Sequence, residues 1–141
     1  MKISLISCSK KKKKGELKAA NKYNSPLFKK SLQLAKLTSD KVYILSAKYH
    51  LLELEEKIKD YDLNLNDFSK KDRISWAKRV YRGLKHKIKQ DDILIFYAGQ
   101  KYYEDLLPLL RNPVKLPLDG MGIGKRLKYL TDKLEGFDEN K

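Results

Sequence analysis

Short apolar runs alternate with helix-like patterns along the whole chain, and this alternation predicts an α/β fold. Four runs have the β-branched and aromatic content of strands: Ile3 to Ser7, Lys41 to Ser46, Ile93 to Tyr97 and Val114 to Leu116. Their consecutive apolar positions are typical of parallel strands that helices cover on both faces.

Helical patterns fill the segments between these runs. Ser25 precedes Pro26 at the start of the first helix, with the serine as its N-cap. A second helix begins at Ser69 or nearby, and Pro108 is expected to kink or end a third. In the second helix the apolar stripe consists of Ile74, Ala77, Tyr81, Leu84 and Ile88. In the last helix it consists of Ile123, Leu127, Leu130 and Leu134.

The alternating order of strands and helices predicts one three-layer α/β domain over residues 1–135. We expect a mainly parallel four-stranded sheet with helices on both faces. Residues 136–141 are expected to form a flexible C-terminal tail.

The charge of the chain points to a polyanionic partner. The 141 residues carry a formal net charge of +14, from 32 basic and 18 acidic residues. DNA, or alternatively RNA, is the simplest partner for such a surface. One face of the helix after Ser69 is expected to hold its backbone, through Lys70, Lys71, Arg73, Lys78, Arg82 and Lys85. A merely basic surface is the alternative, because only five of the 32 basic residues are arginine, the usual choice for specific phosphate contacts.

Cysteine usage and hydropathy narrow the setting. Cys8 is the single cysteine, so the chain forms no internal disulfide and no multi-cysteine zinc site. No apolar run approaches the ~20 residues that span a bilayer. We therefore expect a cytoplasmic protein without metal, cofactor or membrane partner, and its oligomeric state stays open.

Unusual residues follow each of the four predicted strands. Ligands of open α/β sheets bind beyond the carboxyl ends of the strands, so these segments are expected to meet at one edge. The candidates are Ser7, Cys8, Ser9 and Lys10; Ser46, Lys48, Tyr49 and His50; Tyr97, Gly99 and Tyr102; and Gly120, Gly122 and Gly124. Taken singly, Cys8 also reads as a small core residue, the lysine run as a solvated loop, and the glycines as a tight turn.

The long segment after the second strand contains "DYD", Asp60 to Asp62. Two carboxylates there flank Tyr61, an aromatic residue of the kind that stacks on nucleic-acid bases. Connections of this length in compact domains are often functional. The triplet therefore joins the candidate site.

Three motifs in order, "SCSKKK", "LSAKYHLL" and "PLDGMGIGKRLKYL", resemble a family of small bacterial and phage proteins distantly related to the YaaA peroxide-stress proteins. The resemblance covers nearly the whole chain. It implies a uracil-DNA-glycosylase-like domain, an association with DNA and oxidative stress, and, for some similar proteins, excision of modified phage bases. The resemblance also implies that the candidates named above form the site of the family, together with Asp60, Tyr61 and Asp62. His50 departs from the pattern, because relatives commonly have glycine there.

The hypothesis that follows is a hydrolase that cleaves an N-glycosidic bond. A carboxylate stabilises the oxocarbenium-like sugar, and donors near the base stabilise the leaving anion. Asp62 is the first choice for the carboxylate and Asp60 the second. Lys10, Lys48 or the amides near Gly122 serve the leaving group, and Lys48 has a second reading as a Schiff-base nucleophile. Tyr49, Tyr61 and Tyr102 are the candidates for stacking on a flipped base.

Three functions remain open from the sequence. The first is a DNA glycosylase-like hydrolase that removes a modified or damaged base. The second is a non-catalytic nucleic-acid-binding protein of the stress response, and the third is a nucleoside- or nucleotide-processing enzyme.

Overall fold

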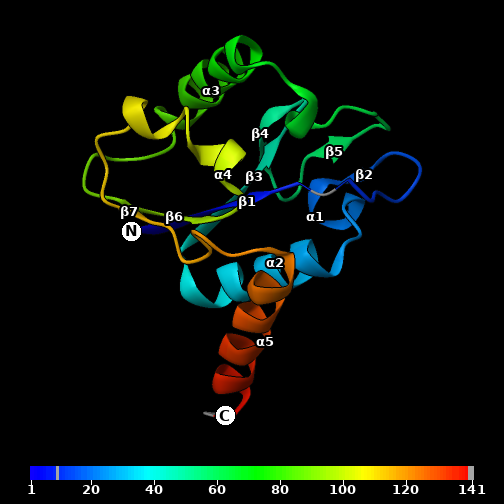
Figure 1. Ribbon diagram of the computed structural model, residues 1–141, viewed down its shortest axis with the longest axis vertical. Helices are drawn as coiled ribbons and strands as arrows, with labels where there is room; N and C mark the ends of the chain where they lie inside the picture. The colour runs from blue at the N-terminus through cyan, green and yellow to red at the C-terminus, as the bar shows by residue number, and fades with distance from the viewer. Residues whose placement is uncertain (9, 140–141) are drawn as a thin grey trace.

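A computed structural model describes residues 1–8 and 10–139 and has a mainly parallel mixed sheet between two layers of helices (Figure 1). The order of its five strands is β4-β3-β1-β6-β7. Their bounds are Lys2–Ser7 for β1, Lys41–Ser46 for β3, His50–Glu53 for β4, Ile93–Tyr97 for β6 and Val114–Lys115 for β7. The α/β fold with a mainly parallel sheet, predicted from the alternating pattern, is confirmed.

The four predicted strands are present and run parallel, but the sheet has five strands rather than four. The additional strand is β4, which returns antiparallel along β3 with Ser46 opposite His50 and Leu45 opposite Leu51. Its four residues, HLLE, are too few to show the alternation of a strand, so they were predicted to belong to the long connection after the second strand. A tight hairpin therefore occupies the start of the long segment that follows β3.

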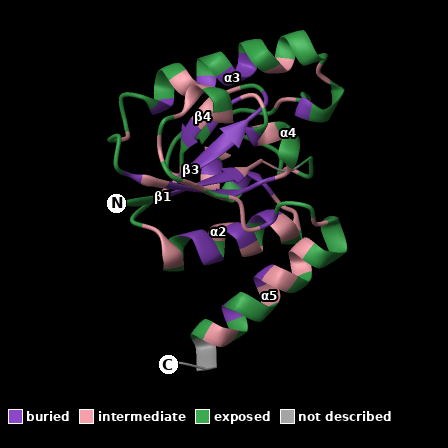
Figure 2. Ribbon diagram, turned by 60° about the vertical axis from the view of Figure 1, so that its left-hand side comes forward, coloured by how far each residue is buried: buried purple, intermediate pink, exposed green. Residues whose placement is uncertain are grey.

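Each face of the sheet has its own core. On one face α3 (Lys70–Leu84) and α4 (Gln100–Tyr103) cover Ile3 and Leu5 of β1. On the other, α2 (Pro26–Thr38) and α5 (Ile123–Glu139) cover Ile6. Buried positions concentrate in the strands, and α5 extends beyond the sheet (Figure 2). Such alternation of neighbouring strand residues between two faces produces three layers.

Short elements complete the chain. β2 (Leu17–Lys18) pairs antiparallel with β5 (Lys57–Ile58), and α1 (Ala19–Lys22) follows β2 directly. Two 3-10 turns cover Leu65–Asp67 and Leu107–Leu109, the second containing Pro108. No helix within the described ranges is long and apolar enough to cross a membrane.

The predicted N-cap at Ser25 and the predicted start of a helix near Ser69 are confirmed, and Ser69 is an N-cap as well. The Ser25 Oγ accepts from the Phe28 amide at 3.1 Å, and the Ser69 Oγ accepts from the Asp72 amide at 3.1 Å. Each serine thus satisfies a backbone donor that the first helical turn leaves without a partner.

The predicted apolar stripes are partly wrong. α3 buries Trp76, Ala77, Val80 and Leu84, whereas Ile74 is exposed. Trp76 donates from Nε1 to the Ser46 carbonyl at 2.8 Å, and this contact sets which side of the helix faces the sheet. In α5, Leu130 and Leu134 are buried but Ile123 is 66% exposed, because this helix begins beyond the edge of the sheet.

α5 continues to Glu139, past the predicted domain boundary at residue 135. Residues 140 and 141 lie outside the described part of the chain, so the flexibility of the tail stays a prediction.

His50 has a φ of 66°, which lies in the left-handed region that favours glycine. Among described non-glycine residues it is the one with a positive φ. The hairpin between β3 and β4 imposes this conformation, which glycine adopts more readily than histidine.

We expect His50→Gly to keep or raise the melting temperature and His50→Val to lower it. The left-handed conformation costs an L-residue roughly 1–2 kcal/mol, and a β-branched side chain tolerates it least. Thermal unfolding of the two variants beside the wild type checks the order. A valine variant as stable as the glycine variant would contradict this account of the hairpin.

Candidate functional site

The topology of the sheet locates a crevice. Among the parallel strands, β1 and β6 lie side by side, β3 borders β1, and β7 borders β6. The connection after β1 therefore leads toward one edge of the sheet, and the connection after β6 leads toward the other. Ligands of doubly wound sheets bind at such a switch point, beyond the carboxyl ends of the two strands. In this chain those ends lead into Cys8 and Gly99.

A cavity of about 610 Å³, here named the large chamber, lies at that switch point. It is lined by the loop after β1, the start of α2, the segment before α3, the loop after β6 and the start of α5. Its residues are Ser7, Cys8, Lys10, Lys11, Ser25, Pro26, Leu27, Phe28, Ser31, Asn64, Asn66, Gly99, Gln100, Lys101, Tyr102, Ile123, Arg126 and Leu127.

A second cavity of about 270 Å³, the small chamber, adjoins it. Its residues are Cys8, Lys10, Lys12, Asp62, Leu63, Asn64, Asp67 and Tyr102. Cys8, Lys10, Asn64 and Tyr102 line both chambers and mark their junction.

Carboxylates distinguish the two chambers. Among the described residues, no Asp or Glu lines the large chamber, whereas Lys10, Lys11, Lys101 and Arg126 do. Asp62 and Asp67 line the small chamber beside Lys10 and Lys12, and both carboxylates are exposed to solvent. The large chamber therefore suits an anionic or electron-rich group, and the small chamber offers carboxylates to a group that develops positive charge.

Tyr102 stands at the junction of the two chambers. Its hydroxyl lies 3.4 Å from the Cys8 Sγ, and its ring packs edge-on against Trp76, with centroids 5.9 Å apart. Burial, and then the neighbouring Cys8, raises the pKa of Tyr102 above its ordinary value. The hydroxyl consequently stays protonated at neutral pH.

Arg126 approaches the loop after β6 closely. Its Nε donates to the Met121 carbonyl at 2.9 Å, and a Cβ built on Gly99 would lie 3.3 Å from its Nη1. Glycine at position 99 thus leaves room for the guanidinium beside the chamber.

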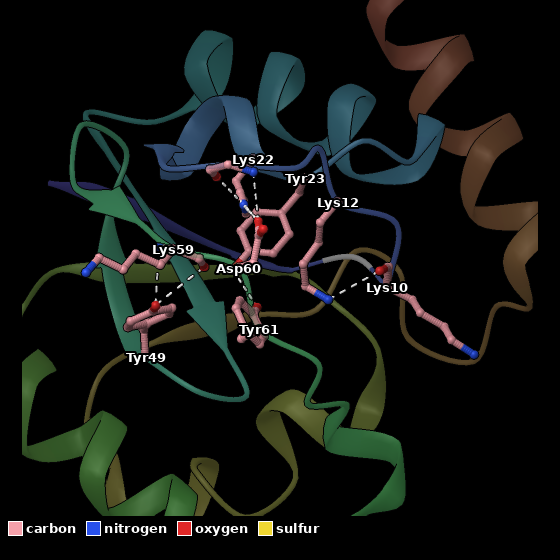
Figure 3. Close-up of polar contacts among 9 residues, drawn as sticks. Lys10, Lys12, Lys22, Tyr23, Tyr49, Lys59, Asp60 and Tyr61 are labelled. Atoms are coloured by element: carbon pink, nitrogen blue, oxygen red, sulfur yellow. Dashed lines mark hydrogen bonds and ion pairs between the residues drawn. The ribbon is translucent and has the colours of Figure 1, made fainter.

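The lysine run forms an ordered arm rather than a free loop. Lys12 forms an antiparallel bridge with Tyr23, and the Lys13 amide donates to the Lys22 carbonyl at 2.8 Å. The Lys12 Nζ lies 4.5 Å from the centre of the Tyr61 ring and donates to the Lys10 carbonyl at 3.2 Å (Figure 3). The residues 10–14, here named the lysine arm, are thereby held along the mouth of the site.

A buried ion pair secures this arm. The Lys22 side chain is 0% exposed and donates to both the Asp60 carboxylate and the Gly15 carbonyl (Figure 3). The Gly15 amide also donates to the Asp60 Oδ1, at 2.9 Å. These hydrogen bonds, that of Lys22 first, lower the pKa of Asp60 below its ordinary value.

Behind the arm lies a network of hydroxyl groups. The Tyr23 and Tyr61 hydroxyls are 2.6 Å apart, and the Tyr61 hydroxyl lies 3.2 Å from the Ser46 Oγ. Burial is the main reason that the pKa of Tyr23 rises to about 12, and it raises the pKa of Tyr61 as well. The network is neutral at physiological pH and joins β3 to the segments on either side of it.

The structure brings part of the predicted site together. Six predicted residues line a chamber: Ser7, Cys8, Lys10, Asp62, Gly99 and Tyr102. The other described candidates line neither chamber: Ser46, Lys48, Tyr49, His50, Asp60, Tyr61, Tyr97, Gly120, Gly122 and Gly124. Ser9 lies outside the described residues.

Several of the candidates outside the chambers have other contacts. The Tyr49 hydroxyl lies within 3.5 Å of the Lys59 backbone, and the Tyr97 hydroxyl lies 3.2 Å from the Thr38 Oγ1. Lys48 is exposed in the hairpin turn, with its Nζ 5.7 Å from the centre of the Tyr49 ring. Catalytic roles for Asp60 and Lys48 stay predictions that nothing in this geometry supports.

Sequence reasoning missed several lining residues. Asn64, Asn66 and Asp67 come from the turn before α3, and Gln100, Lys101 and Arg126 follow recognised glycines by one to four residues. Arg126 follows Gly122 by one helical turn. This spacing would have predicted that Arg126 lies at the mouth of the large chamber. The asparagines carry no comparable signal.

No group of three or more His, Cys, Asp or Glu side chains in residues 1–8 and 10–139 is arranged to hold a metal ion. The described residues that line the chambers supply carboxylates, amines, a guanidinium, amides, hydroxyls, a phenol and a thiol.

Residues 3–132 match the model of a family described as "Family of unknown function (DUF6884)". No curated protein and no solved structure matches the chain.

The ion pair predicts an asymmetric response to mutation. Asp60→Asn leaves the buried Lys22 ammonium without a counter-charge, whereas Lys22→Met leaves a carboxylate that is 64% exposed and open to water. We expect both variants to be less stable than the wild type, and Asp60→Asn to have the lower melting temperature. The reverse order would contradict the assignment of Lys22 as the buried charge.

The same pair predicts a dependence on pH. The folded pKa of Asp60 lies below its unfolded value, so its stabilisation is complete above the ordinary carboxyl range. It disappears as the pH falls through the lowered folded pKa. Between pH 7 and strong acid, the wild type should therefore lose its stability advantage over Asp60→Asn. A constant difference in melting temperature would contradict this linkage.

Proposed function

The chain belongs to the DUF6884 family, a family of unknown function, and we propose that it is a DNA glycosylase-like hydrolase that removes a modified or damaged base. The observation that carries the proposal is that carboxylates line only one of two adjoining chambers. Among the described residues, Asp62 and Asp67 line the small chamber together with Lys10 and Lys12, while the large chamber has lysines, an arginine and amide side chains without a carboxylate. The two ends of a breaking glycosidic bond develop opposite charges, and this arrangement offers a carboxylate to one end and donors to the other.

The charges that develop in the reaction match it. Cleavage of an N-glycosidic bond leaves positive charge on the sugar and negative charge on the departing base. In the small chamber, Asp62 stabilises the oxocarbenium-like sugar and accepts a proton from the attacking water. In the large chamber, hydrogen-bond donors stabilise the base as it leaves with the electron pair of the bond. The proton taken from water and the proton gained by the base complete the balance of a hydrolysis.

Tyr102 and Lys10 are the donors closest to that bond in this proposal, because both line the two chambers. The raised pKa of Tyr102 keeps its hydroxyl available as a donor at neutral pH. The base must first leave the stack, and the apolar side chains of Leu27, Phe28 and Leu127 offer it a surface in the large chamber.

The proposal includes a uracil-DNA-glycosylase-like arrangement of the domain, a distant relationship to the YaaA peroxide-stress proteins, DNA as partner and a cytoplasmic setting. Its support is that "SCSKKK", the first motif of the resemblance, follows β1 at the switch point. Residues of this motif, Cys8 and Lys10, line both chambers.

Abasic-site formation tests the proposal. We would incubate the protein with DNAs that are unmodified, uracil-containing, oxidised, or glucosylated and otherwise hypermodified, and reveal abasic strands with alkali. We expect Asp62→Asn to lower the rate on the active substrate by about 100-fold or more, in the range of positioned acid–base groups. Asp67→Asn is the matched control, because Asp67 lines the same chamber and is exposed as Asp62 is.

The outcomes separate the alternatives. Loss of activity in Asp67→Asn with activity retained in Asp62→Asn would move the catalytic carboxylate to Asp67. Borohydride trapping of a protein–DNA adduct that disappears in Lys48→Gln would restore the Schiff-base mechanism. Binding of every DNA without abasic sites would contradict the hydrolase and favour a non-catalytic DNA-binding protein.

A further inference from the structure

A third cavity lies on the outer side of α2, separate from the chambers. Its volume is about 310 Å³, and we name it the α2 groove. Its polar lining consists of Lys13, Asn21, Lys29, Gln33 and Lys36. Among the described residues that line it there is no Asp or Glu, and its three lysines are exposed.

The α2 groove borders the large chamber, and two features relate them. Phe28 lines both cavities, so one buried ring separates them. The lysine arm connects them as well, since Lys10 and Lys11 line the large chamber and Lys13 lines the groove. A chain of positive charge therefore leads out of the candidate site and along α2.

The charges of the groove are available to a ligand. Among the described ion pairs, none involves Lys13, Lys29 or Lys36. The nearby carboxylate of Glu55 pairs with Lys18 at 2.7 Å. The pKa of Glu55 is lowered by this Lys18 contact and, more weakly, by the charge of Lys36.

The basic face of α3, expected from the sequence to hold the nucleic-acid backbone, is less suited to that role. None of the residues that line either chamber comes from α3. Lys70 pairs with Asp105, and Arg73 pairs with Glu104 at 3.2 Å. Two of the six expected contacts are thus engaged with the protein itself, and the others lie on the far side of the sheet from α2.

We propose that the α2 groove binds the sugar–phosphate backbone of a single nucleic-acid strand whose target nucleotide occupies the chambers. This inference rests on the proposed function, because it assumes a nucleic acid in the candidate site. A groove whose described lining has three exposed lysines and no carboxylate attracts phosphates regardless of base sequence. Its volume of about 310 Å³ accommodates part of one strand. The strand enters along α2, passes the lysine arm and reaches the junction of the chambers.

Salt dependence of binding tests the path. We would measure the affinity of a fluorescein-labelled single-stranded oligonucleotide by anisotropy, between about 50 and 200 mM KCl. The test variant is Lys13→Gln/Lys29→Gln/Lys36→Gln. Its matched control is Lys78→Gln/Arg82→Gln/Lys85→Gln on α3, which removes the same charge from exposed positions. Thermal unfolding of both variants establishes that they fold.

We expect the α2 variant to reduce the slope of log K against log salt concentration by about 2, which corresponds to three lost phosphate contacts on a single strand. The α3 variant should keep the wild-type slope. Equal reductions in both variants, or a larger reduction in the α3 variant, would overturn the inference. So would the absence of any binding by the wild type.

The abasic-site assay on the same oligonucleotides keeps this inference distinct from the proposed function. A slope that depends on the α2 lysines, without abasic sites, would contradict the hydrolase and leave the α2 groove in place. Abasic sites together with an unchanged slope in the α2 variant would contradict the groove alone.

Discussion

The buried ammonium of Lys22 is the constraint on which the arrangement of the site depends. A charge with 0% exposure requires partners, and it finds them in the Asp60 carboxylate and the Gly15 carbonyl. These two residues lie far apart in the sequence: Gly15 follows the lysine arm, and Asp60 precedes Asp62 of the small chamber. By holding them together, Lys22 fixes the lysine arm on one side and the residues that follow Asp60 on the other. Asp62, only two residues further on, is placed at the small chamber as a result.

The division of charge between the chambers follows from this scaffold. The lysine arm supplies Lys10 to both chambers and Lys13 to the α2 groove, while the segment from Asp62 to Asp67 supplies carboxylates to the small chamber alone. The switch point between β1 and β6 opens the space in which these groups meet. One short arm thus links the chemistry proposed at the junction to the surface proposed to hold the strand.

Sequence patterns predicted the elements better than their contacts. The parallel strands, the serine cap of α2 and the start of α3 were readable because each depends on neighbouring residues. β4 was missed, since its four residues carry too little periodicity. Ile74 was wrongly assigned to the buried stripe of α3. The sequence pattern does not show that Trp76 donates to a distant carbonyl, with another side of the helix facing the sheet. Asp60 and Asp62 were both candidates for the carboxylate, with Asp62 first, yet the sequence did not show that Asp60 is engaged with Lys22 and that Asp62 lines a chamber. Such distinctions depend on residues far apart in the chain, which the sequence does not place.

Photochemical cross-linking shows whether nucleic acid binds at the junction of the two chambers. An oligonucleotide carrying 5-iodouracil would be irradiated with the protein, and the attached residue identified by mass spectrometry. We expect attachment at Tyr102, or within the peptide that contains Cys8 and the lysine arm. Attachment confined to α3, none of whose described residues lines either chamber, would contradict binding at the junction.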